Sequence, residues 1–379
     1  MYHEEEFKFN PEILSKERPI GVSGLMRVKN EERFLSLSVE SVIEALDELI
    51  IVYQKSEDRT AEIAEEKRKQ YPDKIKVFFY EPEIKSHKLS DQEFEEQCKL
   101  PKDSIHLLAN YYNYTLSKAT YRYALKIDAD QIYNTVKLKE ICDLYRSQEK
   151  TKISIKENLT GLYFNLITII CFQLSIRFKI KFLKVLPISL YNYYLGYARK
   201  KIQNDKITSS LSGLNLFIKD REPYLLYGAY ENNSFPPFNG VNDHLIFPIN
   251  PKSFYLPAYS RASKSSKYGK CIIERFNWDS HVFKPKGLSH KLVHLGFVWY
   301  HVAPLSYKNL KLDKIFPFMV YDNFSQCDFV NLKDSLSNHR YNRSRIWMWW
   351  YWQNWSKQSN PIKKNWATTL KKIIVKNPS

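Results

Sequence analysis

The chain has 379 residues, of which 44% are hydrophobic, 15% aromatic and 26% charged. This composition excludes a disordered polymer, a collagen-like fibre and a small disulfide scaffold. Lys and Arg number 58 against 41 Asp and Glu, a formal net charge of +17. Such an excess favours an anionic partner such as nucleic acid, lipid headgroups or a phosphorylated substrate.

Residues 19 to 144 alternate short apolar runs with helical periodicity, which predicts strands joined by crossover helices in a mainly parallel sheet. In chain order we expect a strand at 20–26, a helix with inward residues from 35 to 46, and a strand at 49–53. A helix at 61–70, capped by Asp58 or Thr60, a strand at 75–80 and a polar loop should follow. The last elements expected in this part are a helix at 105–116, a strand at 121–127 and a helix at 135–146. Farther on, a strand is expected at 211–218 and a loop rich in Asn, Pro and Gly at 231–243.

The sequence contains no clear export or membrane-spanning signal. Three glutamates at 4–6 stand where a secretory signal needs positive charge, so we expect no export. The uncharged stretch 158–176 is interrupted by polar residues and followed by basic ones, which favours a buried or membrane-lying segment over a span. Five scattered cysteines without a C-x-x-C pair predict neither a zinc site nor a disulfide framework, and favour a reducing compartment.

The most informative motif is Asp128-Ala129-Asp130, directly after the strand expected at 121–127. Because the carboxyl ends of strands in an α/β sheet open onto the ligand crevice, we expect both side chains where substrates bind. Mg²⁺ and Mn²⁺ prefer carboxylate oxygens and usually keep bonds to substrate phosphate. The pair would therefore anchor a nucleoside diphosphate through a metal ion. For the motif taken alone, two solvated acids after a strand are the alternative.

A second motif, Arg27-Val28-Lys29-Asn30-Glu31, occupies the turn from the first strand to the first helix. Backbone N–H groups at that helix start, aided by Arg27 or Lys29, would hold the base, ribose or phosphate of a nucleotide. The alternative is an ordinary helix start with Asn30 as its cap.

These segments resemble the metal-dependent nucleotide-sugar glycosyltransferases of the GT-A fold, because residues 27–31, 56–60 and 127–133 occur in the order expected for that fold. Within the fold, the chain is most similar to bacterial lipooligosaccharide β-1,4-N-acetylgalactosaminyltransferases, which the segments Tyr111-Tyr112-Asn113-Tyr114 and Tyr300-His301 also resemble. The resemblance covers roughly residues 20–145 and the remainder in patches, so it predicts the fold better than it predicts the sugar specificity.

The resemblance implies an α/β, Rossmann-like GT-A core: a mainly parallel central sheet flanked by helices, followed by an aromatic and basic helical extension. The catalytic core would span residues 1–260, with a nucleotide-sugar half at about 19–150 and an acceptor half at about 151–260. Residues 261–379 would complete the active site.

It also implies an inverting transfer of GalNAc, GlcNAc or Gal from a UDP-sugar to a glycan acceptor of lipooligosaccharide or surface polysaccharide. Mn²⁺ or Mg²⁺ would neutralise the charge on the departing diphosphate. Its ligands would be Asp128, Asp130 and one histidine of the C-terminal half, for which we choose His301 over His294. A histidine packed among aromatic residues is the alternative.

The resemblance suggests a general base and a nucleotide-binding set as well. Asp243 is the expected base, with Glu231 as the second choice, and the alternative is that Asp243 merely caps an element. Many related transferases read uracil with an Asp after the second strand, where this chain has Gln54, whose amide would bond the uracil edge instead. The residues expected to bind the nucleotide are Arg27, Lys29, Asn30, Gln54 and Asp128.

The C-terminal segment is unusually rich in tryptophan. Six of the eight tryptophans lie between Trp347 and Trp366, with Lys and Arg on both sides. Tryptophan prefers the bilayer interface, and each basic residue near an anionic leaflet contributes about 1 kcal/mol. We therefore expect residues 340–379 to hold the chain on the inner, cytoplasmic face of the cell membrane, near a lipid-linked or oligosaccharide acceptor. The alternative is an aromatic helix packed on the core or on a partner.

Two other functions stay open. Basic charge interleaved with aromatic residues also suits a single-stranded nucleic-acid-binding protein, and the acidic pair also suits a metal-dependent phosphoryl-transfer enzyme. We expect no nucleic acid, because a phosphate-binding groove gains nothing from Asp128 and Asp130 unless a metal is present. Phosphoryl transfer explains the acids but not the order of the first hundred or so residues.

Overall fold

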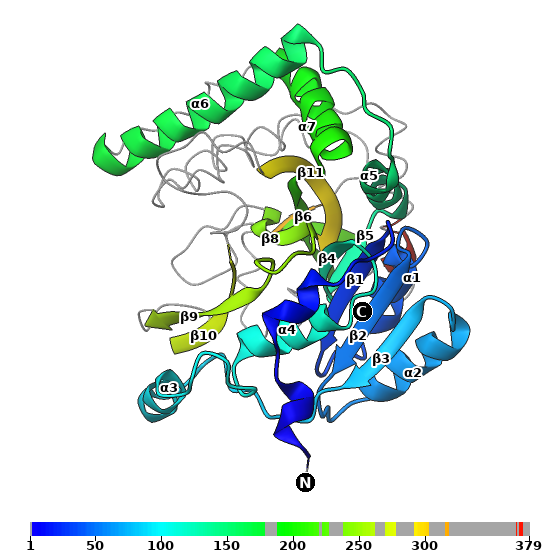
Figure 1. Ribbon diagram of the computed structural model, residues 1–379, viewed down its shortest axis with the longest axis vertical. Helices are drawn as coiled ribbons and strands as arrows, with labels where there is room; N and C mark the ends of the chain where they lie inside the picture. Colours follow the sequence, from blue (N-terminus) through cyan, green and yellow to red (C-terminus); the bar gives the residue numbers. More distant parts are fainter. Residues whose placement is uncertain are drawn as a thin grey trace. The chain divides into compact units, whose positions relative to one another are not determined.

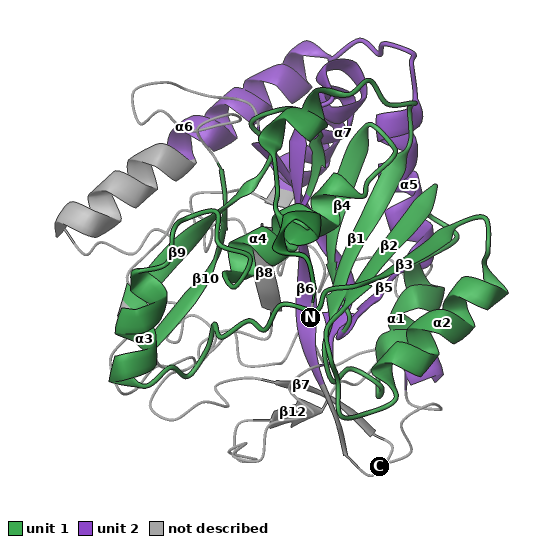
Figure 2. Cartoon of the chain, turned by 60° about the horizontal axis from the view of Figure 1, so that its bottom comes forward, with its two compact units in different colours: residues 1–129, 246–289 green, residues 130–245, 290–379 purple. Residues whose placement is uncertain are grey.

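The computed structural model describes residues 2–178, 188–219, 222–226, 238–261, 270–277, 292–302 and 315–317, together with 369 and 371–373. The chain divides into two compact units (Figure 2). Unit 1 comprises residues 1–129 and 246–289, and unit 2 comprises residues 130–245 and 290–379. This division differs from the boundary expected near residue 260, and the functional halves expected from the sequence stay a prediction.

The described part of unit 1 is built on four parallel strands in the order β4-β1-β2-β3 (Figure 1). They are β1 (Val22–Val28), β2 (Glu48–Tyr53), β3 (Ile75–Phe79) and β4 (Tyr123–Asp128). Residues 246–248 of β8 (Phe238–Pro248) add an antiparallel partner to β4. All of β1 and nearly all of β2 and β4 are buried, which explains why these strands appear in the sequence as continuous apolar runs. The expected mainly parallel sheet is confirmed.

Four described helices belong to unit 1: α1 (Leu35–Val42), α2 (Thr60–Gln70), α3 (Asp91–Cys98) and α4 (Leu108–Ser117). The polar loop expected after β3 is wrong in part, because it contains α3. Ser90 and Glu93 form a capping box at the start of α3, and Phe94 packs with Leu107 and Ile272. The N-cap residue of α2 is Arg59, which makes no side-chain cap bond, but the expected cap Asp58 accepts from the N–H of Thr60, the first residue of the helix, at 3.0 Å.

A second, two-stranded antiparallel sheet of unit 1 consists of β9 (Tyr255–Arg261) and β10 (Lys270–Phe276). Asn113 of α4 attaches β9 to the helix. Its side chain accepts a hydrogen bond from the Tyr255 N–H at 2.7 Å and donates one to the Tyr255 carbonyl at 2.9 Å. The Tyr-Tyr-Asn-Tyr segment therefore has a structural role in joining α4 to this sheet.

The described strands of unit 2 are β5 (Gln131–Tyr133), β6 (Thr208–Lys219), β7 (Glu222–Leu226), β11 (Leu292–His301) and β12 (Ile315–Pro317), with the first part of β8. β11 runs parallel to β6 and antiparallel to β5, and β7 pairs antiparallel with β6 and β12. In this pairing His301 stands opposite Asn215.

The described helices of unit 2 are α5 (Thr135–Arg146), α6 (Ile155–Phe178) and α7 (Tyr191–Asp205). The bounds of α5 are those expected from its sequence, and Asn134 caps it by accepting from the Lys137 N–H. Short 3-10 helices are also present in both units. In unit 1, β1 is preceded by η1 (Glu4–Phe7) and η2 (Pro11–Ser15), and in unit 2, α7 is preceded by η3 (Ile188–Leu190). Within the described ranges, no helix combines the length and the apolar character that crossing a bilayer requires.

Two expectations about the later chain have different outcomes. The loop expected at 231–243 is wrong for 238–243, which belong to β8, while 231–237 lie outside the described residues. Apart from residues 369 and 371–373, which are helical, the expected aromatic and basic extension at 340–379 also lies outside the described residues.

Candidate active site

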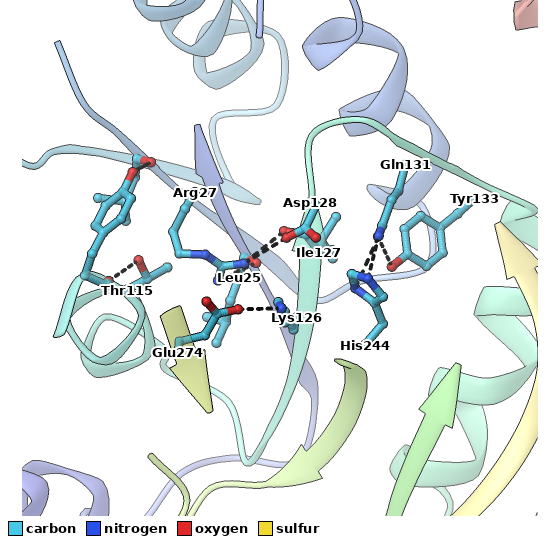
Figure 3. A network of polar contacts seen from close by, with 12 residues as sticks. Leu25, Arg27, Thr115, Lys126, Ile127, Asp128, Gln131, Tyr133, His244 and Glu274 are labelled. Atoms are coloured by element: carbon cyan, nitrogen blue, oxygen red, sulfur yellow. Dashed lines mark hydrogen bonds and ion pairs between the residues drawn. The ribbon is translucent and has the colours of Figure 1, made fainter. Parts of the chain in front are cut away.

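Arg27 and Asp128 meet at the carboxyl edge of the parallel strands in unit 1, where they are register partners on β1 and β4. Arg27 Nη2 donates to Asp128 Oδ1 at 3.3 Å and to the Ile127 carbonyl at 3.2 Å, while Nη1 donates to the Leu25 carbonyl at 3.3 Å (Figure 3). The guanidinium carbon lies 3.6 Å from the centre of the Tyr112 ring. The Arg27 side chain is 4% exposed and that of Asp128 is 36% exposed. A buried cation thus holds one oxygen of a carboxylate that remains accessible.

This arrangement differs from the turn position that the sequence suggested for Arg27. Burial opposes the charge on the guanidinium, but Tyr112 and Asp128 beside it raise the pKa of Arg27 above its ordinary value. Both Nη atoms are engaged, and Nε has no hydrogen-bond partner among the described residues. A direct contact of Arg27 with a nucleotide stays a prediction, whereas its contact with Asp128 is present in the structure.

Lys29 and Asn30 lie in the turn after β1, and both are exposed. Asn30 is not the cap of α1, whose N-cap residue is Phe34, so that alternative is wrong. Asn30 has a left-handed backbone with φ 56°, and its Oδ1 accepts from the Glu57 N–H at 2.9 Å. Its own N–H donates to Ser56 Oγ at 3.1 Å. Asn30 therefore ties the turns after β1 and β2 together.

Gln54 follows β2 directly and is 7% exposed. Its Nε2 donates to the Pro82 carbonyl at 2.9 Å, and its backbone N–H donates to the Val28 carbonyl at 3.0 Å. The amide nitrogen thus already bonds to protein backbone, and the expected contact with uracil stays a prediction.

A buried ion pair lies two residues before Asp128 on the same strand. Lys126 Nζ is 2.9 Å from Glu274 Oε1 of β10, and the two side chains are 2% and 12% exposed (Figure 3). Residues two apart in a strand point to the same face, so Lys126 and Asp128 share one face of β4. This pair was not predicted from the sequence. The available signal was a lysine inside an apolar strand, which requires a buried counter-ion.

In unit 2, Asp130 approaches His301 because β11 pairs antiparallel with β5, which begins one residue after Asp130. His301 Nε2 lies 3.3 Å from Asp130 Oδ2, and His301 Nδ1 lies 2.9 Å from Asn215 Oδ1. Because an amide oxygen can only accept, Nδ1 carries a proton. Nε2 then faces the carboxylate either as part of an imidazolium or with its lone pair. In the second case the lone pair of Nε2 faces the negative carboxylate, and a cation bound by both groups would relieve this repulsion.

The spacing of this pair suits a divalent cation. Two ligands at about 2.1 Å from one ion and at a right angle lie about 3.0 Å apart, close to the observed 3.3 Å. The side chains are 14% and 21% exposed, so the pair is partly shielded from water. Among the described residues, no group of three or more Asp, Glu, His or Cys gathers. Asp130 and His301 would therefore supply two ligands, and the metal-binding role of Asp128, which is described with unit 1, rests on the motif.

The other predicted site residues are placed as follows. His294 is 5% exposed, and its backbone N–H donates to the Tyr194 hydroxyl at 3.1 Å. The histidine that approaches an acid of the motif is His301, as expected. Asp243 lies in β8, a strand rather than the expected loop, and its role as base stays a prediction. Glu231 lies outside the described residues.

A buried polar group beside β5 was not expected. Gln131 Nε2 lies 2.7 Å from His244 Nε2, and the Tyr133 hydroxyl donates to Gln131 Oε1 at 3.0 Å (Figure 3). The His244 ring packs edge-on against Trp299 of β11 with ring centres 4.9 Å apart. These contacts hold β5, and with it the backbone next to Asp130.

Residues 2–171 match the family model described as Beta-1,4-N-acetylgalactosaminyltransferase (CgtA). This part of the chain resembles that glycosyltransferase family. The match includes β1, β4 and both acids of Asp128-Ala129-Asp130, so the resemblance inferred from the sequence is confirmed over this range. The comparison with curated proteins gives no match.

Two kinds of solved structure are similar over part of this chain, each with 17% identity and a TM-score of 0.21. One is glucosyl-3-phosphoglycerate synthase from Mycobacterium tuberculosis in complex with Mn²⁺, uridine-diphosphate and phosphoglyceric acid, where the match covers 32% of this chain and 36% of that chain. The other is S. aureus TarS 1-349, with 32% of this chain and 31% of that chain covered. The match thus spans about a third of each known chain, and nothing further follows from TM-scores this low.

Proposed function

We propose that this chain is a metal-dependent, inverting glycosyltransferase that moves GalNAc, or a related GlcNAc or Gal, from a UDP-sugar to a glycan acceptor. The observation that carries the proposal is the approach of Asp130 to His301 within a chain whose residues 2–171 match this family. An acid of the motif and a distant histidine are thereby brought to a spacing that suits one divalent ion.

Mn²⁺ or Mg²⁺ bound there would neutralise the negative charge that develops on the departing diphosphate. Asp130 and His301 would hold the ion, and Asn215, which accepts from Nδ1 of His301, would leave Nε2 as the ligand atom. Arg27 donates to Oδ1 of Asp128 and would thereby orient this carboxylate. Lys29, Asn30 and Gln54 contact the nucleotide.

Inversion requires a base on the side of the sugar ring opposite the leaving group, because the acceptor hydroxyl loses its proton as it attacks the anomeric carbon. Asp243 fills this role in the proposal, and Glu231 is the second choice. The acceptor is lipid-linked or an oligosaccharide of the cell surface. Residues 340–379 keep the enzyme on the cytoplasmic face of the membrane.

A thermal-shift screen of nucleotide-sugars with and without Mn²⁺ tests the donor and the metal together. A ligand at about 100 times its Kd stabilises the fold by about 2.7 kcal/mol, so a true donor raises Tm measurably. We expect this rise for a UDP-sugar only when Mn²⁺ is present, and we expect Asp130→Asn and His301→Gln to lose it.

Asp73→Asn, at an exposed position, is the matched control and should respond like the unaltered chain. A UDP-sugar shift that is the same without Mn²⁺, or that survives both site variants, would reject the metal site. Release of inorganic phosphate in place of sugar transfer would favour the phosphoryl-transfer alternative.

A further inference from the structure

The first half of α6 exposes a row of aliphatic side chains. Ile155, Leu159, Leu162 and Leu166 are 79%, 60%, 41% and 49% exposed. Their spacing of four, three and four residues places them along one face of the helix. We call these four residues the α6 stripe. Isolated exposed leucines are ordinary, but a continuous row along one helix face marks a contact surface.

The opposite face of the same helix is firmly packed on α7, which lies beside α6 in Figure 1. Phe164 is fully buried and stacks on Tyr194 with ring centres 4.4 Å apart. Gly161 lies so close to Tyr197 that a Cβ there would be 2.5 Å from the tyrosine ring. The helix is therefore held by one face, and the α6 stripe is left on the other.

Two exposed lysines lie at the start of the α6 stripe. The acid nearest to them on this helix, Glu157, is paired with Lys200 at 2.8 Å. Lys152 and Lys156 are exposed at the start of the helix, and Lys156 Nζ lies 5.9 Å from the ring centre of Tyr193, which is 41% exposed. A partner that offers both negative charge and an apolar interior would complement these side chains.

We propose that the α6 stripe docks on an anionic bilayer surface, with its aliphatic side chains at the boundary between headgroups and acyl chains and the neighbouring lysines at the lipid phosphates. A second copy of this chain, or its own basic tryptophan-rich segment, would bring more positive charge to the same place. A nucleic-acid strand would stack on aromatic rings rather than on an aliphatic row. Anionic lipid supplies both required features.

This contact goes beyond the sugar-transfer reaction, and it adds a second membrane surface to the one expected for residues 340–379. Its test needs no sugar, so its outcome is independent of the proposed function. The full chain is sedimented with vesicles of phosphatidylethanolamine and phosphatidylglycerol in equal parts, and with vesicles of phosphatidylcholine alone.

The variant Leu159→Gln with Leu162→Gln should bind the anionic vesicles about tenfold more weakly, because two partly buried leucine contacts are lost. The matched control is Val136→Gln, which removes a side chain of α5 that is 55% exposed, and its binding should be unchanged. Thermal melting checks that each variant is folded.

A second variant, Lys152→Gln with Lys156→Gln, keeps the α6 stripe and should also bind about tenfold more weakly, with less dependence on salt. This variant decides the question if the leucine variant does not fold. Unchanged vesicle binding by both variants, equal binding to phosphatidylcholine, or loss of binding only on removal of residues 340–379 would each overturn the proposal. So would a leucine variant that dissociates a dimer while binding vesicles normally, because the stripe would then join two copies.

Discussion

Replacing Arg27 by lysine tests whether the buried arginine positions Asp128. Lysine keeps the positive charge but loses the planar fork that reaches Asp128, Ile127 and Leu25 together. It also loses the stacking on Tyr112 at 3.6 Å. A hydrogen bond from a charged group contributes about 1.5–3 kcal/mol, and a cation over a ring about 0.5–2 kcal/mol. With at least one bond kept by lysine, we expect a loss of about 2–4 kcal/mol in the free energy of unfolding.

The effect on metal binding is the more specific expectation. Loss of a group that orients a metal ligand typically weakens metal affinity about 10–100-fold. Mn²⁺ affinity is measured by electron paramagnetic resonance in the presence of UDP, and stability by urea denaturation. Arg68→Lys is the control, because Arg68 is about half exposed and pairs with Glu65 on the surface of α2.

A double-mutant cycle separates positioning from general destabilisation. If Arg27 acts through Asp128, then Arg27→Lys adds little to the loss of Mn²⁺ affinity already caused by Asp128→Asn. Full Mn²⁺ affinity in folded Arg27→Lys, or losses that simply add in the double variant, would refute the reasoning.

Three further predictions concern stability, catalysis and membrane binding. Glu48 is buried and accepts hydrogen bonds from Ser23, Thr120 and Lys76. Burial opposes the charge of this carboxylate, but the hydrogen bonds lower its pKa below 4.5. Glu48→Gln should therefore lower the free energy of unfolding by about 2–4 kcal/mol at neutral pH, measured by urea denaturation. The difference in unfolding free energy between the unaltered chain and Glu48→Gln should reach its full size above pH 4.5 and shrink as the pH falls through the folded-state pKa. A difference that does not change with pH would contradict this prediction. Asp243→Asn should keep donor binding by thermal shift but lower sugar transfer about 10²–10⁴-fold, and unchanged transfer would move the base elsewhere. Removal of residues 340–379 should release part of the protein from anionic vesicles in sedimentation, and identical binding would exclude the tail.

Local patterns were enough to predict the parallel strands and several helices. The strands β1, β2 and β4 are apolar runs because both of their faces are buried, and such runs are visible without any partner. The bounds of α5 follow from its helical periodicity and the cap at Asn134. The position of Asp128 at the end of a strand followed from the same kind of information.

Contacts between distant segments were decided only by the tertiary structure. The counter-ion of Lys126 is Glu274, which lies 148 residues later in the chain. No local sequence pattern near either residue predicts this pairing. Asp130 meets His301 because β5 pairs with β11, and the register of that pairing selects His301 rather than His294. Residues near in sequence set periodicity and caps, because those depend on neighbouring backbone groups. Which charged groups meet depends on strand order, register and burial, which exist only once the chain has folded.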